Sequence, residues 1–245
     1  MLRPPESSSK NSALPWRDSA NAMSSETWQI ILFTIEVSAL STLLILPFGI
    51  AIAWLLARRD WPGKSLIETV VMLPLFVPPV ATGFVLLMLF GRHGPLGSIL
   101  QRAAGIDVVF TWRAVVLAGA VMSLPLLVRT AQNAFQEVNT RLEDIARTLG
   151  AGEWRVFRTI SLPLALRGVI TGTVLAFARA MGEFGATVVV AGMIPRRTMT
   201  ISLAIYQTIQ LGHDAEALPL LLVSIGIVFL TVLCGQLISR RKGAR

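Results

Sequence analysis

Two oppositely charged side chains, Arg179 and Glu183, stand in an otherwise apolar stretch of this sequence. A spacing of four residues places them on one face of a helix, where they can neutralise each other. Ionisable groups in such a stretch commonly face a cavity or one another. Two interpretations follow. Either Arg179 attracts an anion while Glu183 tempers its charge, or the two form an ion pair that fixes helix packing, which we favour.

Prolines interrupt another apolar stretch of the sequence. Pro74, Pro78 and Pro79 remove backbone donors, which forces a break or kink in a helix. Interrupted helices often line a transport path. A structural kink whose backbone groups bond to neighbouring helices fits equally well. Pro125, with Ser123 close by, admits the same two interpretations. The candidate pathway residues are therefore Pro78, Pro79, Ser123, Arg179 and Glu183.

Other patterns that resemble chemical sites are incomplete. Residues 63–65 read Gly-Lys-Ser, like the end of a P-loop, but Arg58 occupies the position of the required first glycine. His93 and His213 lie in separate loops without a nearby ligand pattern. The single cysteine, Cys234, lies in an apolar run and forms neither a disulfide framework nor a metal site. We expect no catalytic residue, no metal site and no cofactor.

The composition indicates a membrane protein. Of the 245 residues, 53% are hydrophobic and only 15% are charged, and the mean hydropathy is +0.66. The net charge of +8 would suit nucleic acid, but the basic residues fall in short loops between apolar runs. We therefore expect contact with membrane lipid and none with nucleic acid.

Five apolar runs are long enough to cross a bilayer, which requires roughly 20 residues in helical form. The sequence thus predicts an all-α polytopic membrane protein with about five transmembrane helices. Glu36, the one charged residue of the first run, is expected to face protein and not lipid. The runs are Trp28–Ala57, Ser65–Phe90, Trp112–Val128, Gly168–Gly192 and Leu218–Ile238.

The distribution of Lys and Arg predicts the topology. Basic residues concentrate in the first loop, in the loop from Arg129 to Arg167 and at the C-terminus, and cationic loops stay in the cytoplasm. The N-terminus then lies outside. Residues 1–26 read as a disordered polar tail, 27–240 as one transmembrane domain and 241–245 as a cytoplasmic tail.

Residues 139–163 predict two short helices joined by a glycine corner. Thr140 and Glu143 form a capping box, Gly150 suits a helix C-cap, and Pro163 limits the second helix. From this pattern alone, the first helix either lies against its own bundle or the lipid head groups, or docks on another protein. It carries a narrow apolar stripe of Leu142, Ile145, Ala146 and Leu149.

This segment resembles the EAA motif of ABC import permeases, in which Glu-Ala-Ala is followed at fixed spacing by Gly and then by Ile-x-Leu-Pro. The sequence departs from the motif at Asp144 and Ile145 and keeps the charge and the apolar character there. The resemblance implies that residues 139–163 are a coupling loop that docks on a separate ATPase. The residues that match the motif positions are Asp144, Ile145, Ala146, Gly150, Ile160, Leu162 and Pro163.

Further stretches resemble the molybdate permeases. They are Ala57–Leu66, Leu73–Gly83, Phe177–Pro195 and Thr198–Tyr206. The resemblance implies the ABC importer permease fold, import of molybdate or tungstate across the bacterial inner membrane, two copies of a cytoplasmic ATPase and a periplasmic molybdate-binding protein. One chain of five helices encloses too little for a gated path, so we expect a homodimer. The alternative is a sulfate or thiosulfate permease. A membrane enzyme lacks a visible catalytic constellation, and the EAA-like loop argues against a passive channel or a secondary transporter.

Overall fold

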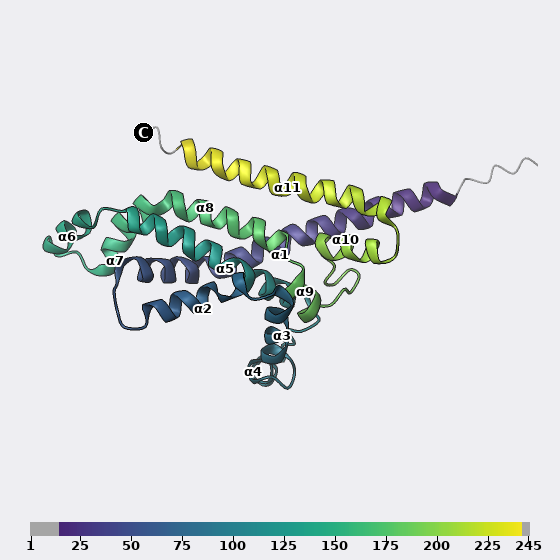
Figure 1. Ribbon diagram of the computed structural model, residues 1–245, viewed down its shortest axis with the longest axis horizontal. Coiled ribbons are helices and arrows are strands. Elements are labelled where there is room, and N and C mark those ends of the chain that lie inside the picture. The colour runs from purple at the N-terminus through teal and green to yellow at the C-terminus, as the bar shows by residue number, and fades with distance from the viewer. Residues whose placement is uncertain (1–14, 242–245) are drawn as a thin grey trace, which may run out of the picture.

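The computed structural model describes residues 15–241, with side chains described from residue 25 to residue 237. Every regular element within these residues is a helix (Figure 1). In chain order they are α1 (Pro15–Arg58), α2 (Lys64–Phe76), α3 (Pro79–Phe90), α4 (Pro95–Ala104), α5 (Trp112–Glu137), α6 (Thr140–Thr148), α7 (Glu153–Val156), the π-helical turn η1 (Phe157–Ser161), α8 (Leu162–Met181), α9 (Gly185–Val190), α10 (Ile201–Gln210) and α11 (Asp214–Arg241).

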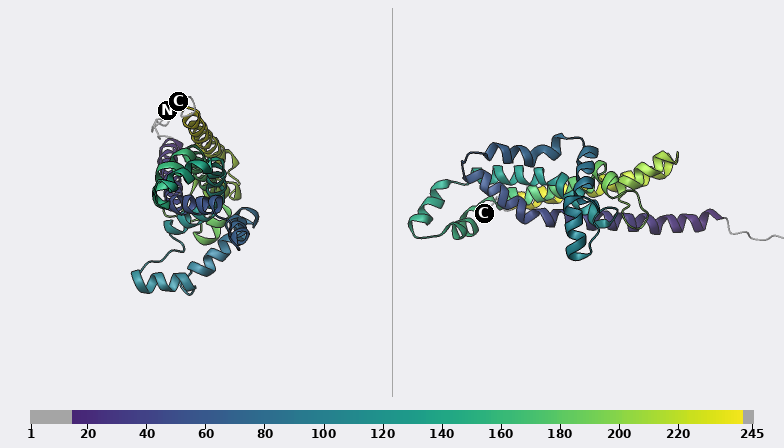
Figure 2. Two further views of the ribbon diagram at one scale, coloured as in Figure 1. Left: turned by 90° about the vertical axis from the view of Figure 1, so that its left-hand side faces the viewer. Right: turned by 90° about the horizontal axis from the view of Figure 1, so that it is seen from below.

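Three long helices form the centre of the structure. α5 packs against both α1 and α8, and α1 also contacts α8. α11 lies along α8, and α2 packs against α5. Figures 1 and 2 show these helices running along the length of the molecule, with α6 and α7 at one end and the arm formed by α3 and α4 projecting to the side.

Small residues bring α8 close to α5. Gly168 and Gly172 are four residues apart on α8, which is the small-xxx-small spacing of closely packed membrane helices. A Cβ atom at Gly172 would lie 3.2 Å from the carbonyl oxygen of Leu127, and one at Gly168 would overlap the Cβ of Ala134. Glycine at these two positions therefore sets the distance between the two helices.

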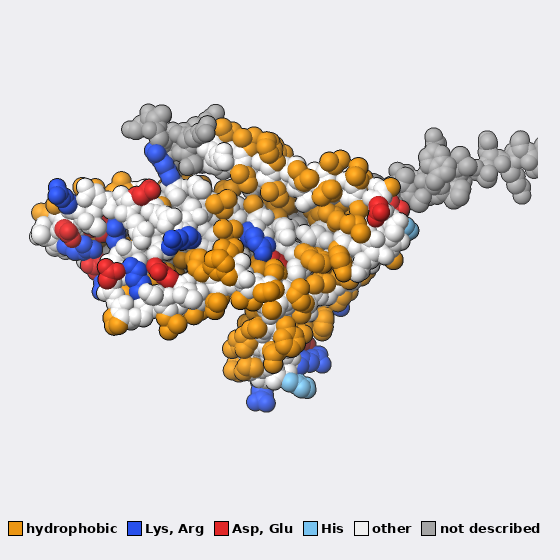
Figure 3. All heavy atoms as spheres, viewed as in Figure 1, with side chains coloured by type: hydrophobic (Ala, Val, Ile, Leu, Met, Phe, Trp, Pro, Cys, Tyr) orange, Lys and Arg blue, Asp and Glu red, His pale blue; other side chains and the backbone are white. Residues whose placement is uncertain are grey.

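Four helices in the described part of the chain are long and apolar enough to cross a membrane, and the bent pair α2–α3 would make a fifth. They correspond to the five predicted spans, and the protein is a polytopic α-helical membrane protein. In Figure 3, hydrophobic side chains cover the visible faces of α11 and of the α3–α4 arm, whereas Lys, Arg, Asp and Glu gather over the α6–α7 end.

The second predicted span is broken into two helices. α2 and α3 meet at an angle of 113°, and Pro78 in an extended conformation precedes the first residue of α3, Pro79. A proline restricts the residue before it to extended backbone, so two in succession end the helix here. Pro74 and Pro125 instead lie inside helices.

Two predicted boundaries differ from the structure. The third span continues beyond Val128 to Glu137. The fourth is not continuous from Gly168 to Gly192, because α8 ends at Met181 and α9 begins at Gly185. The third span is longer than predicted because hydropathy marks only the membrane-embedded part of a helix, whereas the helix continues as long as its backbone hydrogen bonds do. The break in the fourth span was missed because the sequence around the turn between α8 and α9 remains mostly apolar.

The N-terminal tail also differs in part. Residues 15–26, predicted as disordered, belong to α1, whereas residues 1–14 lie outside the described residues. Extending an existing helix by one residue fixes that residue alone and gains one hydrogen bond, so polar residues next to a long helix continue it readily. Of the predicted C-terminal tail, residue 241 ends α11 and residues 242–245 lie outside the described part.

Candidate functional site

The segment between α5 and α8 folds as two helices around a corner. The Asn139 side chain accepts a 3.0 Å hydrogen bond from the backbone N–H of Arg141 and so caps α6. Gly150 follows α6 with φ at 87°, in the left-handed region that glycine adopts without steric strain. The two predicted helices and their glycine corner are confirmed. We call residues 139–163 the α6–α7 loop.

Two predicted details of this loop are wrong. The capping residue is Asn139 and not Thr140, and the carboxylate of Glu143 binds side chains in place of the backbone. The second helix does not end at Pro163 but continues through η1 into α8. In η1 the N–H of Leu162 bonds to the carbonyl of Phe157, five residues back. This wider turn accommodates a proline ring that would clash in a regular α-helix.

Glu143 is buried at the base of the α6–α7 loop, with only 1% of its surface exposed. One carboxylate oxygen lies 2.9 Å from Nη2 of Arg58 and accepts a 2.7 Å hydrogen bond from Oγ of Ser161. The same Nη2 donates to the carbonyl of Val138 at 3.0 Å. A buried carboxylate needs such partners to offset its lost hydration. These contacts attach α6 to the end of α1 and to the turn that begins α8.

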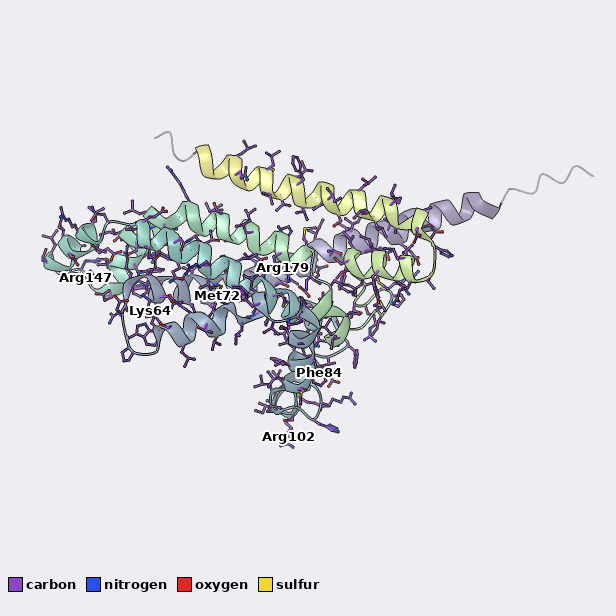
Figure 4. All side chains as sticks on the ribbon, in the orientation of Figure 1. Lys64, Met72, Phe84, Arg102, Arg147 and Arg179 are labelled. Carbon is purple, nitrogen blue, oxygen red and sulfur yellow. The ribbon has the colours of Figure 1, made fainter. Side chains whose placement is uncertain are left out.

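Arg147 joins α6 to α7 across the glycine corner. Its Nη1 donates to Asp144 at 2.8 Å and its Nε to Glu153 at 2.9 Å. The hydrogen bond to Glu153 raises the pKa of Arg147 above its usual value, so this link stays charged. Figure 4 shows Arg147 at the α6 end of the molecule.

Aromatic rings fix the same loop to the central bundle. The ring of Phe157 lies 5.2 Å from that of Trp54 on α1 and 6.2 Å from that of Phe135 on α5, measured between centroids. Trp154 stacks on its outer side at 5.4 Å. Aromatic pairs at these separations add to the stability gained by burial. The base of the loop is therefore rigidly held.

The apolar stripe of α6 faces away from the rest of the chain. Leu142, Ile145 and Leu149 are 45%, 57% and 83% exposed, and Ala146 is half-buried. The structure thus excludes the interpretation that this stripe packs against its own bundle. A rigid base that carries exposed leucine and isoleucine side chains is suited to contact with another surface.

The structure divides the predicted loop residues into two groups. Asp144, Ile145, Ala146 and Gly150 lie on the projecting corner, whereas Ile160, Leu162 and Pro163 lie where η1 passes into α8. Pro163 lines a groove of about 1370 Å³ with polar residues of α5 and α8 that include Arg129 and Asn133. The first group can touch a second protein directly, and the second can move only together with α8.

Arg179 and Glu183 form the predicted ion pair, with Nη1 and Oε2 2.7 Å apart. Glu183 is 3% exposed, and its Oε1 also accepts a 2.8 Å hydrogen bond from the backbone N–H of Ala186. The pair therefore bridges the turn between α8 and α9 and caps α9. Figure 4 shows Arg179 near this turn, and 26% of its side chain is exposed.

The fold brings some of the candidate pathway residues together. A Cβ at Gly185 would lie 2.6 Å from the Cβ of Pro79, and one at Gly83 would lie 2.7 Å from the backbone of Ala186. The bend at Pro78–Pro79 thus sits against the turn that Glu183 holds. Ser123 is separate and fully buried, and its hydroxyl donates within α5 to the carbonyl of Gly119 at 2.6 Å.

Sequence reasoning missed two features of the structure. The partnership of Arg58 and Glu143 carried no local signal, because the two residues lie on different helices. Glu36, expected to face protein, is exposed and lines cavities of about 490 Å³ and 530 Å³. Its position on the helix face follows from tertiary packing, which periodicity does not give. Lys64 of the incomplete P-loop pairs with Asp60.

No group of three or more His, Cys, Asp or Glu side chains that could hold a metal ion occurs among the described residues. His213 approaches Glu216 at 3.8 Å within one turn, and His93 lies at the tip of the arm after α3. Within the α6–α7 loop, Arg147 is paired with Asp144 and Glu153. These contacts hold the loop in one shape.

Comparison with known proteins is consistent with this architecture. Residues 45–243 match the family of binding-protein-dependent transport system inner membrane components. Among solved structures, a bacterial ABC transporter involved in the import of the acidic polysaccharide alginate superimposes with a TM-score of 0.71 at 18% identity, covering 95% of this chain and 85% of that one. The MetNI methionine ABC transporter gives 0.66 at 18% identity, covering 91% and 97%.

Curated relatives are more similar in sequence. The molybdenum transport system permease protein ModB of Escherichia coli K12 is 49% identical over 214 residues, which is 87% of this chain and 93% of the relative. The protein of the same name from Haemophilus influenzae is 43% identical, covering 85% of this chain and 91% of the relative. The sulfate transport system permease protein CysW of Synechococcus elongatus is 34% identical, covering 88% of this chain and 75% of the relative.

Proposed function

We infer the function from one premise: this chain belongs to the family of binding-protein-dependent transport system inner membrane components. It is the membrane-spanning permease of an ABC importer, and a separate subunit hydrolyses ATP. We propose that its cargo is molybdate or the closely similar tungstate. The observation that carries this proposal is the similarity to molybdenum permeases over almost their whole length, which exceeds the similarity to a sulfate permease.

The α6–α7 loop is the proposed contact with the ATPase. Its exposed Leu142, Ile145 and Leu149 supply an apolar surface, and charged Asp144 and Arg147 border it. A helix with an apolar face and charged edges suits binding in a groove of a partner. Because the base of the loop is fixed to α1, α5 and α8, a displacement at α6 would pass to the membrane helices as a rigid-body motion.

The proposed assembly has two copies of this chain and two ATPase subunits, with the pathway between the permeases. A periplasmic molybdate-binding protein would deliver the anion at the outer loops. The exposed apolar side chains of α3 and α11 in the single chain are consistent with contact to lipid or to a second copy. The proposed orientation puts the α6–α7 loop and the C-terminus in the cytoplasm and the N-terminus in the periplasm.

Within the pathway proposal, the bend at Pro78–Pro79 and the turn held by Arg179 and Glu183 form one unit. The carboxylate of Glu183 contacts both the Arg179 guanidinium and the backbone N–H of Ala186, which supports a packing role for the pair. The partial exposure of Arg179 leaves its charge accessible to an anion that passes along this face. Ser123, buried and bonded within α5, is proposed to have a structural role near Pro125 and not to contact the anion.

The test is an ATPase measurement on the permease purified with its ATPase in nanodiscs. Binding protein is added without ligand or loaded with molybdate, tungstate or sulfate. We expect stimulation by the molybdate-loaded and tungstate-loaded forms. Stimulation by the sulfate-loaded form alone would assign the chain to sulfate import, and a permease that does not co-purify with any ATPase would contradict the proposal for the α6–α7 loop.

A further inference from the structure

Three arginines meet in a cavity of about 490 Å³ at the end of the bundle opposite α6. Arg113 comes from the first turn of α5, and Arg196 and Arg197 come from the segment between α9 and α10. Trp112 and Glu36 also line this space, which we call the outer cavity. Glu36 lies about 33 Å along α1 from Arg58 at 1.5 Å per residue, near the far boundary of a bilayer core of about 30 Å.

The backbone around the outer cavity is held in one conformation. Thr198 is fully buried, and its hydroxyl donates to the carbonyl of Gly192 and accepts from the N–H of Ile194, both at 3.0 Å. Arg196 has φ at 59°, a left-handed conformation that is rare for residues other than glycine, asparagine and aspartate. Such strained residues persist only where the surrounding structure holds them, and they concentrate at functional sites.

Arg113 is positioned from the other side of the outer cavity. Its Nη1 donates to the carbonyl of Asp107 at 3.2 Å, and its guanidinium lies 5.3 Å from the centre of the Trp112 ring. A carbonyl oxygen and an aromatic face both orient a guanidinium without neutralising its charge. The full positive charge of Arg113 therefore remains available to a ligand.

The charges in the outer cavity are incompletely compensated. Among the described residues, neither the Arg197 guanidinium nor the Glu36 carboxylate takes part in an ion pair or a side-chain hydrogen bond. Arg196 pairs with Glu26 at 3.2 Å, but both side chains are largely exposed, so water screens this pair. The lining of the cavity thus presents three cationic side chains and one carboxylate, that of Glu36, while Glu26 lies outside the lining.

We propose that the outer cavity binds a tetrahedral oxyanion and is the first site on the permease for the transported dianion. Guanidinium groups bind such oxygens through paired hydrogen bonds, and several around one hollow raise the local anion concentration. Glu36 opposes the bound charge and keeps the complex weak enough to release it. This role of the site rests on the proposed function, whereas the binding of a tetrahedral oxyanion rests on the geometry alone.

The same chemistry has a second source, because the outer cavity lies at the level of lipid phosphates. The experiment therefore separates the two. Radiolabelled molybdate is titrated by flow dialysis against the permease–ATPase complex without binding protein, first in nanodiscs of neutral phosphatidylcholine and then in nanodiscs that contain phosphatidylglycerol. The complex is used in its unmodified form and with substitutions at Arg197, Glu36 and Arg102, the last being an arginine on α4 outside the cavity.

Substitutions of Arg197 and Glu36 should change the affinity for molybdate in opposite directions. Arg197→Gln should weaken molybdate binding by about fivefold or more, since it removes a charge-assisted contact. Arg197→Lys should restore part of the loss, and Glu36→Gln should strengthen binding. Arg102→Gln should leave binding unchanged. A purely structural role of these residues would not give this pattern of signs, and tryptophan fluorescence and co-purification of the ATPase verify that each variant is folded.

Three results would overturn the inference. The first is equal binding by the unmodified complex and the Arg197 and Glu36 variants. The second is absence of molybdate binding by the unmodified complex in neutral lipid. The third is competition by phosphatidylglycerol that Arg197→Gln abolishes while molybdate binding stays the same, which assigns the cavity to a lipid phosphate. In each case, stimulation of the unmodified complex by molybdate-loaded binding protein tests the proposed function separately.

Discussion

Arg58, the last residue of α1, and Glu143 on α6 form a buried ion pair of 2.9 Å. Only 8% and 2% of the two side chains are exposed. The contact joins the end of the first membrane helix to a loop far away in the sequence. Ser161 bonds to the same carboxylate and so adds the start of α8. One carboxylate thereby ties three segments into a single unit.

Replacement of Glu143 should be strongly destabilising. Glu143→Gln leaves Arg58 buried without its counter-charge, which costs about 3–5 kcal/mol. We expect a lower Tm of the purified complex and a loss of ATPase stimulation by loaded binding protein. The control is Asp60→Asn, which removes the exposed pair of Asp60 with Lys64 and should cost under about 1 kcal/mol. Equal Tm values for the two variants would contradict the structural role of Glu143.

Gly150 and Gly152 provide a matched pair for the corner of the α6–α7 loop. A Cβ atom would meet nothing within 4 Å at either residue, but only Gly150 has a positive φ. Gly150→Ala should therefore cost about 1–2 kcal/mol through backbone strain alone and weaken ATPase association. Gly152→Ala should be close to neutral. Pull-down of the ATPase by each variant is the measurement, and a larger loss with Gly152→Ala would refute this account.

Leu149 should matter for assembly and not for folding. It is 83% exposed at the end of α6, so Leu149→Asp removes little buried surface within the chain. It would place a charge in an apolar contact with the ATPase, and we expect at least a tenfold loss of affinity, about 1.4 kcal/mol. Leu211→Asp, at an exposed leucine beyond α10, is the control. Unchanged ATPase binding by the Leu149 variant would remove α6 from the interface.

Close contact between α3 and α9 should be intolerant of larger side chains. Gly83→Val would drive a branched side chain into the backbone of Ala186 and separate the two helices, at a cost of about 1–3 kcal/mol. Uptake of molybdate into proteoliposomes by this variant should fall as well. Gly226→Ala on α11, where a Cβ meets nothing within 4 Å, should retain uptake. Normal uptake by the Gly83 variant would show that this contact can open freely.

Arg179 distinguishes the packing role of the ion pair from a role in the pathway. Arg179→Gln leaves the nearly buried Glu183 without its cation. If the main role of the ion pair is to stabilise helix packing, this variant should have a Tm lower by several degrees. The apparent affinity for loaded binding protein should then stay the same. A variant with unchanged Tm and a raised half-maximal concentration of molybdate-loaded protein would instead support a direct effect on the anion.

Much of the fold could be predicted from local patterns. Hydropathy located the five spans, because every backbone group in a bilayer must be bonded within the helix. The prolines at 78 and 79 marked the break between α2 and α3 for an equally local reason. The glycine corner after α6 was also readable, since glycine adopts a positive φ without steric strain. In contrast, the continuation of α7 through η1 into α8 was missed, because a π-turn leaves no clear pattern in the sequence.

The sequence by itself determined that this is a polytopic helical membrane protein with a charged, apolar-striped loop that resembles the EAA motif of ABC import permeases. Hydropathy, helix breakers and motif spacing are properties of neighbouring residues. Only the tertiary structure decided which distant residues meet. It paired Arg58 with Glu143, exposed the stripe of α6 and brought Arg113, Arg197 and Glu36 to one cavity. Such contacts depend on how rigid helices pack in three dimensions, which periodicity along one helix does not specify.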